Sequence, residues 1–311
     1  MSASEQVAVL GAGTMGHGIA QVAAMAGYRV ALFDVTPGAA ERGLERVEGN
    51  LAKGVALGKV EPTHRDDTLG RLRAANALDD ALAGADLVIE AAPEQVELKQ
   101  KLLRQVEPLV GPDTLLATNT SSLSIATLAA ALERPGRFLG LHFFNPVHLM
   151  ALVEVVWGPD TKPDVLDRAV AFVRALAKEP VVVKDSPGFA SSRLGVILGL
   201  EAMRMVEEGV ASPADIDRAM ELGYRHPLGP LRLTDVIGLD VRLDIARYLH
   251  EALGSEAFRP PAILERLVAE GRTGQKAGRG FYDWSEEGVE EGEHAARRGS
   301  ARVQGRNDDE S

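Results

Sequence analysis

The chain has 311 residues, of which 45% are hydrophobic and 25% charged, with a net charge of −11 and no cysteine. This length exceeds what one hydrophobic core usually fills, so we expect two domains. The acidic balance argues against nucleic acid as a partner, and the lack of cysteine excludes disulfides, thiolate metal sites and cysteine nucleophiles.

The sequence also lacks features of membrane proteins. No apolar run reaches membrane-spanning length, and the N-terminus does not have the basic and then apolar layout of a secretory signal. We therefore expect a cytoplasmic protein with no membrane partner. We also expect no bound metal.

The first predicted elements are a short strand, Val7 to Leu10, the turn Gly11-Ala12-Gly13-Thr14-Met15-Gly16 and a helix rich in small residues. In this glycine signature the first glycine allows a tight turn, the second lets the backbone approach a pyrophosphate, and the third lets the helix pack close to the strand. The helix N-terminus then attracts phosphate. Such a signature predicts a dinucleotide site, although a turn that binds no phosphate is the alternative.

Asp34 follows the second predicted strand, Tyr28 to Phe33, at about the spacing that a dinucleotide ribose requires. Its carboxylate would accept hydrogen bonds from both ribose hydroxyls and would repel a 2′-phosphate. The sequence therefore predicts NAD rather than NADP as the cofactor.

Two exposed helices come next, from Pro37 to about Lys53 and from Pro62 to Leu72, and we interpret them as a helical insertion. Further strands then alternate with helices, which predicts a mostly parallel α/β sheet of the Rossmann type. The expected strands are Asp86 to Glu90, Thr114 to Thr118, Arg137 to Leu141, Leu152 to Val156 and Val181 to Lys184, and the helices are Val96 to Val106 and Asp164 to Ala177.

The pattern changes at the turn Asp185-Ser186-Pro187-Gly188, after which only helical periodicity is found. We therefore predict an NAD-binding domain over residues 1–184 and an all-helical domain over 185–284. Ser212, followed by Pro213, has the pattern of a capping box at one helix start. From 285 to 311 the chain has almost no apolar residues, and we expect a disordered acidic tail.

Oxidation of an alcohol by NAD requires a base near neutral pH, which is the chemistry of histidine. His142 follows a predicted strand at the edge where open α/β sheets bind ligands. Glu154 lies in the apolar strand twelve residues later, where an unpartnered carboxylate would be costly. A His142–Glu154 pair across adjacent strands would explain both, although a strand carboxylate can also simply face solvent. His148 is a competing base that spacing does not exclude.

Several motifs in order resemble the L-3-hydroxyacyl-CoA dehydrogenase family, particularly its bacterial 3-hydroxybutyryl-CoA members. They cover roughly residues 5 to 284. The matching segments include the glycine turn, Glu90-Ala-Ala-Pro-Glu94, Asn119-Thr-Ser-Ser-Leu123, His142-Phe-Phe-Asn-Pro146, Leu152-Val-Glu-Val155, Asp185-Ser-Pro-Gly-Phe189, Gly229-Pro-Leu-Arg-Leu-Thr-Asp235, Gly238-Leu-Asp240 and Lys276-Ala-Gly-Arg-Gly-Phe-Tyr282.

The resemblance implies that His142 is the catalytic base and that Glu154 is its partner. It implies that Ser121 binds the substrate oxygen near the nicotinamide and that Asn145 orients the reacting groups. Two simpler roles stay open: Ser121 could cap a helix beginning near Ile125, and Asn145 could be a turn residue before proline.

The same resemblance implies further contacts with cofactor and substrate. For NAD these are Gly11, Gly13, Thr14, Met15, Gly16, Asp34, Glu94, Lys99, Asn119, Ser121, Asn145 and Lys276. For coenzyme A, whose phosphates need local cations in an acidic protein, the candidates are Asn50, Lys53, Lys59, Ser121 and Ser192.

One residue departs from the family pattern. Ser192 stands where the family usually has an asparagine that joins the active site. Serine is shorter but is still both donor and acceptor, so a water could bridge the gap. This departure bears on the geometry of substrate binding more than on the class of reaction.

Together, the motifs and the resemblance imply a two-domain, NAD-dependent (S)-3-hydroxyacyl-CoA dehydrogenase acting on short acyl chains. The resemblance also implies a two-fold dimer formed through the helical domain. A dehydrogenase of a non-CoA hydroxy acid of the gulonate type is one alternative. A catalytically silent, crystallin-like NAD-binding protein is another, which the presence of His142 and Glu154 disfavours.

Overall fold

The computed structural model describes residues 5–285, which separate into two compact units, residues 5–192 and residues 193–285. The predicted boundary at Asp185 lies a few residues before this division. The predicted disordered tail lies almost wholly outside the described residues.

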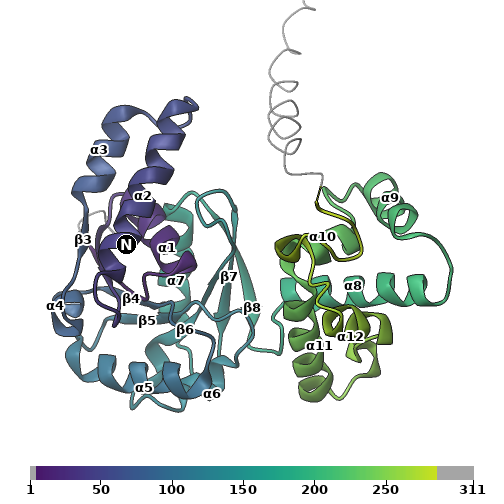
Figure 1. The fold of residues 1–311 in the computed structure, drawn as a ribbon. Coiled ribbons are helices and arrows are strands. Elements are labelled where there is room, and N and C mark those ends of the chain that lie inside the picture. Colours follow the sequence, from purple (N-terminus) through teal and green to yellow (C-terminus); the bar gives the residue numbers. More distant parts are fainter. Residues whose placement is uncertain (1–4, 286–311) are drawn as a thin grey trace, which may run out of the picture. The chain divides into compact units, whose positions relative to one another are not determined.

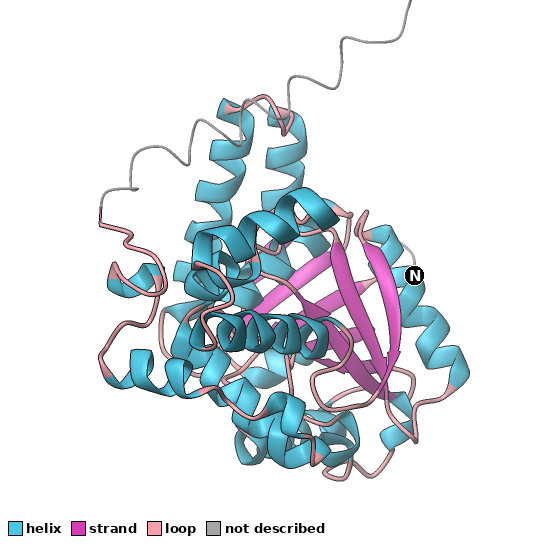
Figure 2. Cartoon of the chain, turned by 90° about the vertical axis from the view of Figure 1, so that its right-hand side faces the viewer, coloured by secondary structure: helices cyan, strands magenta, loops and turns pink. Residues whose placement is uncertain are grey.

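An eight-stranded sheet forms the centre of the first unit (Figures 1 and 2). Its order is β3-β2-β1-β4-β5-β6-β7-β8, and every neighbouring pair is parallel except β6 with β7. This arrangement confirms the predicted mostly parallel Rossmann-type sheet. The strands are β1 (Gln6–Leu10), β2 (Arg29–Phe33), β3 (Leu72–Ala74), β4 (Leu87–Glu90), β5 (Leu115–Thr118), β6 (Phe138–Phe143), β7 (Leu152–Trp157) and β8 (Glu179–Lys184).

Helices connect these strands. They are α1 (Thr14–Met25), α2 (Ala39–Ala56), α3 (Pro62–Gly70), α4 (Leu78–Leu82), α5 (Val96–Val106), α6 (Ile125–Ala129) and α7 (Pro163–Ala175), with 3-10 turns at Glu107–Leu109 and Pro135–Arg137. The predicted insertion is present as the hairpin of α2 and α3, which projects from the sheet (Figure 1).

Several predicted boundaries differ from the structure by a few residues, and two of these differences change where a residue lies. Leu72 does not end the second insertion helix but begins β3, a strand too short for its three residues to show an alternating pattern; pairing with β2 holds it in place. In addition, β6 extends to Phe143, so His142 lies within the strand rather than after it.

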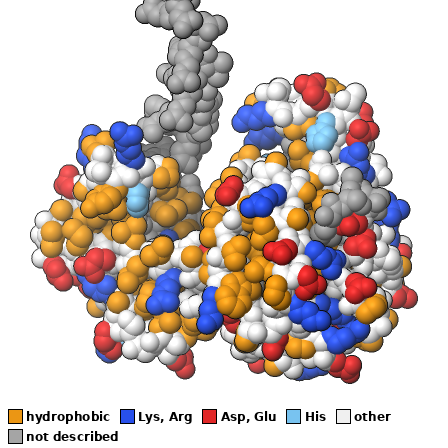
Figure 3. Space-filling view, turned by 180° about the vertical axis from the view of Figure 1, so that it is seen from behind, with side chains coloured by type: hydrophobic (Ala, Val, Ile, Leu, Met, Phe, Trp, Pro, Cys, Tyr) orange, Lys and Arg blue, Asp and Glu red, His pale blue; other side chains and the backbone are white. Residues whose placement is uncertain are grey.

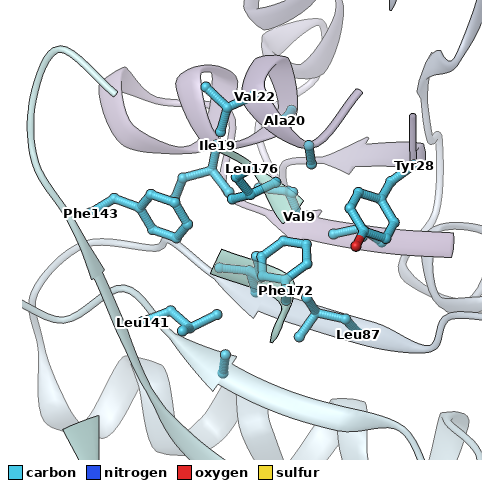
Figure 4. Close-up of a cluster of buried hydrophobic side chains, with 14 of the residues drawn as sticks. Val9, Ile19, Ala20, Val22, Tyr28, Leu87, Leu141, Phe143, Phe172 and Leu176 are labelled. Atoms are coloured by element: carbon cyan, nitrogen blue, oxygen red, sulfur yellow. The ribbon is translucent and has the colours of Figure 1, made fainter. Parts of the chain in front are cut away.

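Both faces of the sheet are buried along the central strands β1, β4, β5 and β6, which explains their continuous apolar runs, whereas the edge strand β8 is largely exposed. Along β1, Val7 and Val9 point to one core, whereas Ala8 and Leu10 point to the other, as the two-residue period of a strand requires. In the first core the rings of Tyr28 and Phe172 lie 5.2 Å apart, between strands and helices α1 and α7 (Figure 4).

The second unit is helical. Its helices are α8 (Ser191–Glu207), which begins at the end of the first unit, α9 (Pro213–Tyr224), α10 (Pro230–Ile237), α11 (Leu239–Leu253) and α12 (Ala262–Ala269), with 3-10 turns at Glu256–Phe258 and Gln275–Ala277. Ser212 caps α9 by accepting a hydrogen bond from the backbone N–H of Asp215, as predicted. Within residues 5–285, no helix combines the length and apolar character needed to cross a membrane.

Two buried carboxylates connect the second unit's helices to its final segment. Asp235 accepts hydrogen bonds from the backbone N–H groups of Phe281 and Tyr282 and from the indole of Trp284. Asp217 accepts from the N-terminus of α10 and from the Tyr282 hydroxyl. Because charge-assisted hydrogen bonds are the stronger kind, these two residues fix the position of the 281–284 segment.

Candidate active site

The glycine turn between β1 and α1 has the geometry that a dinucleotide requires. A Cβ atom at Gly11 would strike the carbonyl of Ala91, and one at Gly16 would strike the carbonyl of Gly11. Gly13, by contrast, faces open space. The turn is therefore tight where strand and helix meet and accessible where a phosphate would approach the backbone.

A cavity of about 760 Å³ lies against this turn. Its lining includes Gly11, Gly13, Thr14, Met15 and Asp34. The carboxylate of Asp34 is held by the backbone N–H groups of Ala12 and Thr36, each at 2.8 Å. These contacts fix an acidic group at the end of β2, which fits the ribose of NAD and disfavours a 2′-phosphate.

A second cavity, of about 360 Å³, brings together candidates that are distant in the sequence. Its lining also includes Met15 and Ala91, which line the first cavity. The predicted site residues that line it are Glu94, Asn119, Ser121, His142 and Asn145. They come from the ends of β4, β5 and β6, because the carboxyl ends of parallel strands share one edge of the sheet.

His142 and Glu154 form the predicted pair. They are direct partners in the antiparallel register of β6 and β7, and His142 Nδ1 lies 2.8 Å from Glu154 Oε2. A carboxylate only accepts, so Nδ1 carries the donated hydrogen and Nε2 is left for substrate. The rings of Phe144 and Phe189 lie 4.3 and 5.8 Å from the imidazole and limit its movement.

Glu154 is further held by the segment that leads into α8. The backbone N–H groups of Ala190 and Ser191 donate to Oε1 at 3.1 and 2.8 Å, and the Ser191 hydroxyl donates to Oε2 at 2.8 Å. Burial alone would raise the pKa of Glu154, but the hydrogen bonds from His142 and Ser191 outweigh it and lower the pKa below its ordinary value. Glu154 is thus an anion at neutral pH.

Ser121 lies in a loop organised by Glu94. Glu94 Oε1 accepts from the hydroxyl of Thr120 at 2.6 Å and from the backbone N–H and hydroxyl of Ser121 at 2.8 and 3.1 Å. Burial alone would raise the pKa of Glu94. The charge of Lys99 and these hydrogen bonds lower the pKa by more than burial raises it, so the pKa of Glu94 lies below its ordinary value. The alternative role of Ser121 as a helix cap is wrong, because Ser124 caps α6.

Lys99 reaches the site only indirectly. Its side chain is fully buried, and Nζ contacts Glu90 Oε1 and Oε2 at 2.8 and 2.9 Å and the carbonyl of Ala92 at 3.1 Å. Glu94 lies 3.5 Å from the same ammonium. A direct contact with a cofactor would require exposed surface that Lys99 lacks, so it positions the 91–94 loop instead.

Asn119 and Asn145 have different roles in the loops. The side-chain oxygen of Asn119 accepts from the backbone N–H of Phe143 at 2.9 Å and so joins the end of β5 to β6. Asn145 is exposed in the turn after β6 and precedes Pro146 through a cis peptide bond. Its predicted orienting role and its alternative as a turn residue are therefore both compatible with its place at the cavity.

The coenzyme A candidates are spread over the insertion. Asn50 donates to Gln21 at 3.1 Å and joins α2 to α1, whereas Lys53 and Lys59 are exposed. Ser192 lies in the first turn of α8. Lys276 belongs to the second unit, where Nζ pairs with Asp240 at 2.6 Å.

His148, the competing base, lines a different cavity, of about 390 Å³, together with His64 and Lys178. Burial and the neighbouring His17, Lys178 and Lys53 lower its pKa. His142 is thus the histidine that lines the cavity containing Ser121 and Asn145.

Sequence reasoning missed Ser191 and Glu90. The neighbouring Ser192 was singled out as unusual, but nothing in the spacing indicates that Ser191 contacts Glu154. Glu90 ends a buried strand, and its position in an apolar run was the one feature that could have indicated a buried partner such as Lys99.

The lowered pKa of Glu154 predicts a pH-dependent contribution to stability. A carboxyl group whose pKa is lower in the folded state than in the unfolded state contributes its full stabilisation at pH values above the unfolded-state pKa, here about 4.5. This stabilisation is lost as the pH falls through the folded-state pKa. Glu154→Gln should reduce the free energy of unfolding by about 2–3 kcal/mol at neutral pH. Urea unfolding of both proteins should show this difference narrowing below pH 4.5; a constant difference would contradict the argument.

Comparison with known proteins agrees with this geometry. Residues 6–186 match the family model for the NAD-binding domain of 3-hydroxyacyl-CoA dehydrogenase, and residues 188–284 match that of its C-terminal domain.

Among individual proteins, the 3-hydroxybutyryl-CoA dehydrogenase of Bradyrhizobium diazoefficiens is 44% identical over 280 residues, which cover 90% of this chain and 95% of that protein. A Bacillus subtilis protein named "Probable 3-hydroxybutyryl-CoA dehydrogenase" is also 44% identical, over 91% of this chain and 98% of its own. The crystal structure of (S)-3-hydroxybutyryl-CoA dehydrogenase from Ralstonia eutropha superposes with a TM-score of 0.88 at 40% identity, over 91% of this chain and 100% of that one. The chain therefore belongs to the 3-hydroxyacyl-CoA dehydrogenase family of NAD-dependent oxidoreductases.

Proposed function

We propose that this enzyme interconverts (S)-3-hydroxyacyl-CoA and 3-oxoacyl-CoA, with short acyl chains such as 3-hydroxybutyryl as substrates. The observation that carries the proposal is the His142–Glu154 hydrogen bond, 2.8 Å long, in a cavity that shares Met15 with the dinucleotide cavity. A base and a nucleotide site are thus adjacent. The substrates of the named relatives support the acyl-CoA assignment.

In this proposal His142 Nε2 takes the proton of the substrate hydroxyl. NAD, when bound, supplies the hydride acceptor. As His142 becomes an imidazolium, Glu154 stabilises the new charge through the bond to Nδ1 and keeps the ring in the tautomer that leaves Nε2 basic. In the reverse direction the same imidazolium returns the proton to the oxygen of the reduced ketone.

Ser121 and Asn145 are proposed to hold the reacting oxygen. The hydroxyl of Ser121 donates to Glu94 in the structure, so it must rotate to donate to a ketone oxygen. The exposed amide of Asn145 can donate a second hydrogen bond. Neither group takes the substrate proton permanently, so both can bind the alcohol and the ketone.

Recognition of coenzyme A is proposed to involve the insertion and α8. Lys53 and Lys59 are exposed cations on and just after α2, and Asn50 lies one turn before Lys53. Phosphate groups favour such cations in a chain of net charge −11. Ser192 is proposed to contact the acyl portion, and Lys276 to contact the cofactor.

The helical unit is proposed to form a homodimer with a second copy. Hydrophobic side chains gather on the face of this unit seen in Figure 3. Large apolar side chains are exposed on α9, α10 and α11, and α10 packs against both of the other two helices. They include Leu222 and Tyr224 of α9, which are 73% and 76% exposed, and Leu233, Val236 and Ile237 of α10 and Val241 of α11. An exposed surface of this kind usually marks an interface. The cytoplasmic location stays a prediction of the sequence.

The acyl-CoA assignment predicts a strong preference for the thioester. NADH oxidation by the purified protein should be at least about 100-fold higher in kcat/KM with acetoacetyl-CoA than with free acetoacetate or gulonate-type acids, since remote binding energy contributes to transition-state stabilisation. Equal turnover of the thioester and the free acids would overturn the assignment.

The proposed base predicts that His142→Ala lowers kcat by about 10²–10⁴-fold. The affinity for NADH should change little, because the glycine turn and Asp34 lie apart from this side chain. His148→Ala serves as the matched control and should retain most activity. If instead His148→Ala abolished turnover and His142→Ala did not, the base would be misassigned.

The proposed dimer predicts that Leu222→Glu with Tyr224→Glu shifts the protein to monomers, because charges at the centre of an apolar interface are poorly solvated. Analytical ultracentrifugation of the full chain measures this. Leu109→Glu, at a half-exposed position of the first unit, is the control. A wild-type protein that sediments as a monomer would contradict the proposal.

A further inference from the structure

Ser191 shares one carboxylate oxygen with the proposed base. Its Oγ lies 2.8 Å from Glu154 Oε2, and His142 Nδ1 lies 2.8 Å from the same atom. The other oxygen, Oε1, is occupied by the backbone N–H groups of Ala190 and Ser191. The side chain of Glu154 is 1% exposed, so water does not take the place of these donors.

The direction of the Ser191 hydrogen bond follows from the ionisation of Glu154. An ionised carboxylate has no hydrogen to give, so the hydroxyl must donate, as Nδ1 of His142 must. Oε2 therefore accepts two hydrogen bonds from side chains that approach from different elements, β6 and the start of α8. Both donors therefore interact with the negative charge of the Glu154 carboxylate.

The Ser191 hydroxyl has two opposing effects on His142, both of which act through Glu154. The hydroxyl, together with the two backbone donors, holds the carboxylate in the orientation that faces His142. At the same time, a second donor on Oε2 reduces the charge available to stabilise an imidazolium at His142. The first effect favours a fixed tautomer, and the second limits how basic Nε2 becomes.

We propose that Ser191 is a positioning residue that sets the working pH of the reaction, by donating its hydroxyl hydrogen to the Glu154 oxygen that orients His142. This inference rests on the proposed function of His142 as the base.

The test is the pH profile of kcat/KM for NAD-dependent oxidation of 3-hydroxybutyryl-CoA. Activity in this direction needs the unprotonated imidazole, so it falls on the acid side of the profile. Without the serine donor, Oε2 stabilises the imidazolium more strongly. The acid limb of Ser191→Ala should therefore move to higher pH, by about 0.5–1 pH unit.

A matched pair separates the hydroxyl from packing. Ser191→Thr keeps the hydroxyl, and Ser191→Val gives a side chain with nearly the shape of threonine but no hydroxyl. We expect the limb of the valine variant to move with that of the alanine variant and the limb of the threonine variant to stay near the wild-type position. Thermal unfolding and NADH binding, measured on each variant, check that the fold and the nucleotide site are intact.

Three outcomes would overturn the inference. The limb could stay in place in both the alanine and valine variants, it could move to lower pH because the carboxylate turns away from His142, or it could move equally in the threonine and valine variants. With an active wild-type enzyme, each of these counts against Ser191 alone. A wild-type profile without an acid limb would count against the base itself as well as against Ser191.

Discussion

One buried hydrogen bond, between His142 and Glu154, determines how the rest of the site works. Both side chains are almost inaccessible to water, and their strands run antiparallel so that the two residues face each other directly. An ionised carboxylate in such a place would be costly without partners. The structure provides four donors to it, and this arrangement fixes the tautomer of the histidine.

The sheet explains why the other groups lie nearby. β1, β4, β5 and β6 run parallel, so the turns that follow them meet at one edge. That edge carries the glycine turn, the loop of Glu94, the loop of Ser121 and the segment of Asn145. The one antiparallel pairing, between β6 and β7, then places the carboxylate of Glu154 directly beside His142. A fully parallel sheet would not make the same pair of direct neighbours from residues only twelve apart.

A second buried network supports this edge. Lys99 is surrounded by Glu90, Glu94 and the carbonyl of Ala92, so the loop after β4 is held by an ammonium that never reaches solvent. The same loop carries Glu94, which organises Thr120 and Ser121. The position of Ser121 therefore depends on charges buried beneath it.

Much of this could be predicted from the sequence, because the strands are continuous apolar runs and the glycine turn has few structural alternatives. The sequence could suggest that His142 and Glu154 lie on adjacent strands. It could not give the register that places the two residues opposite each other, because that register depends on how β6 and β7 pair. β3 was missed because three residues show no period. Ser191 and the burial of Lys99 were missed because both depend on contacts between distant segments.

In the proposed mechanism His142, oriented by Glu154, faces the reacting oxygen of the substrate. A crystal structure of the enzyme with NAD and acetoacetyl-CoA tests this most directly. We expect the C3 oxygen to lie within hydrogen-bond distance of His142 Nε2, with Nδ1 still hydrogen-bonded to Glu154. A substrate oxygen bound by His148, or by neither histidine, would contradict it.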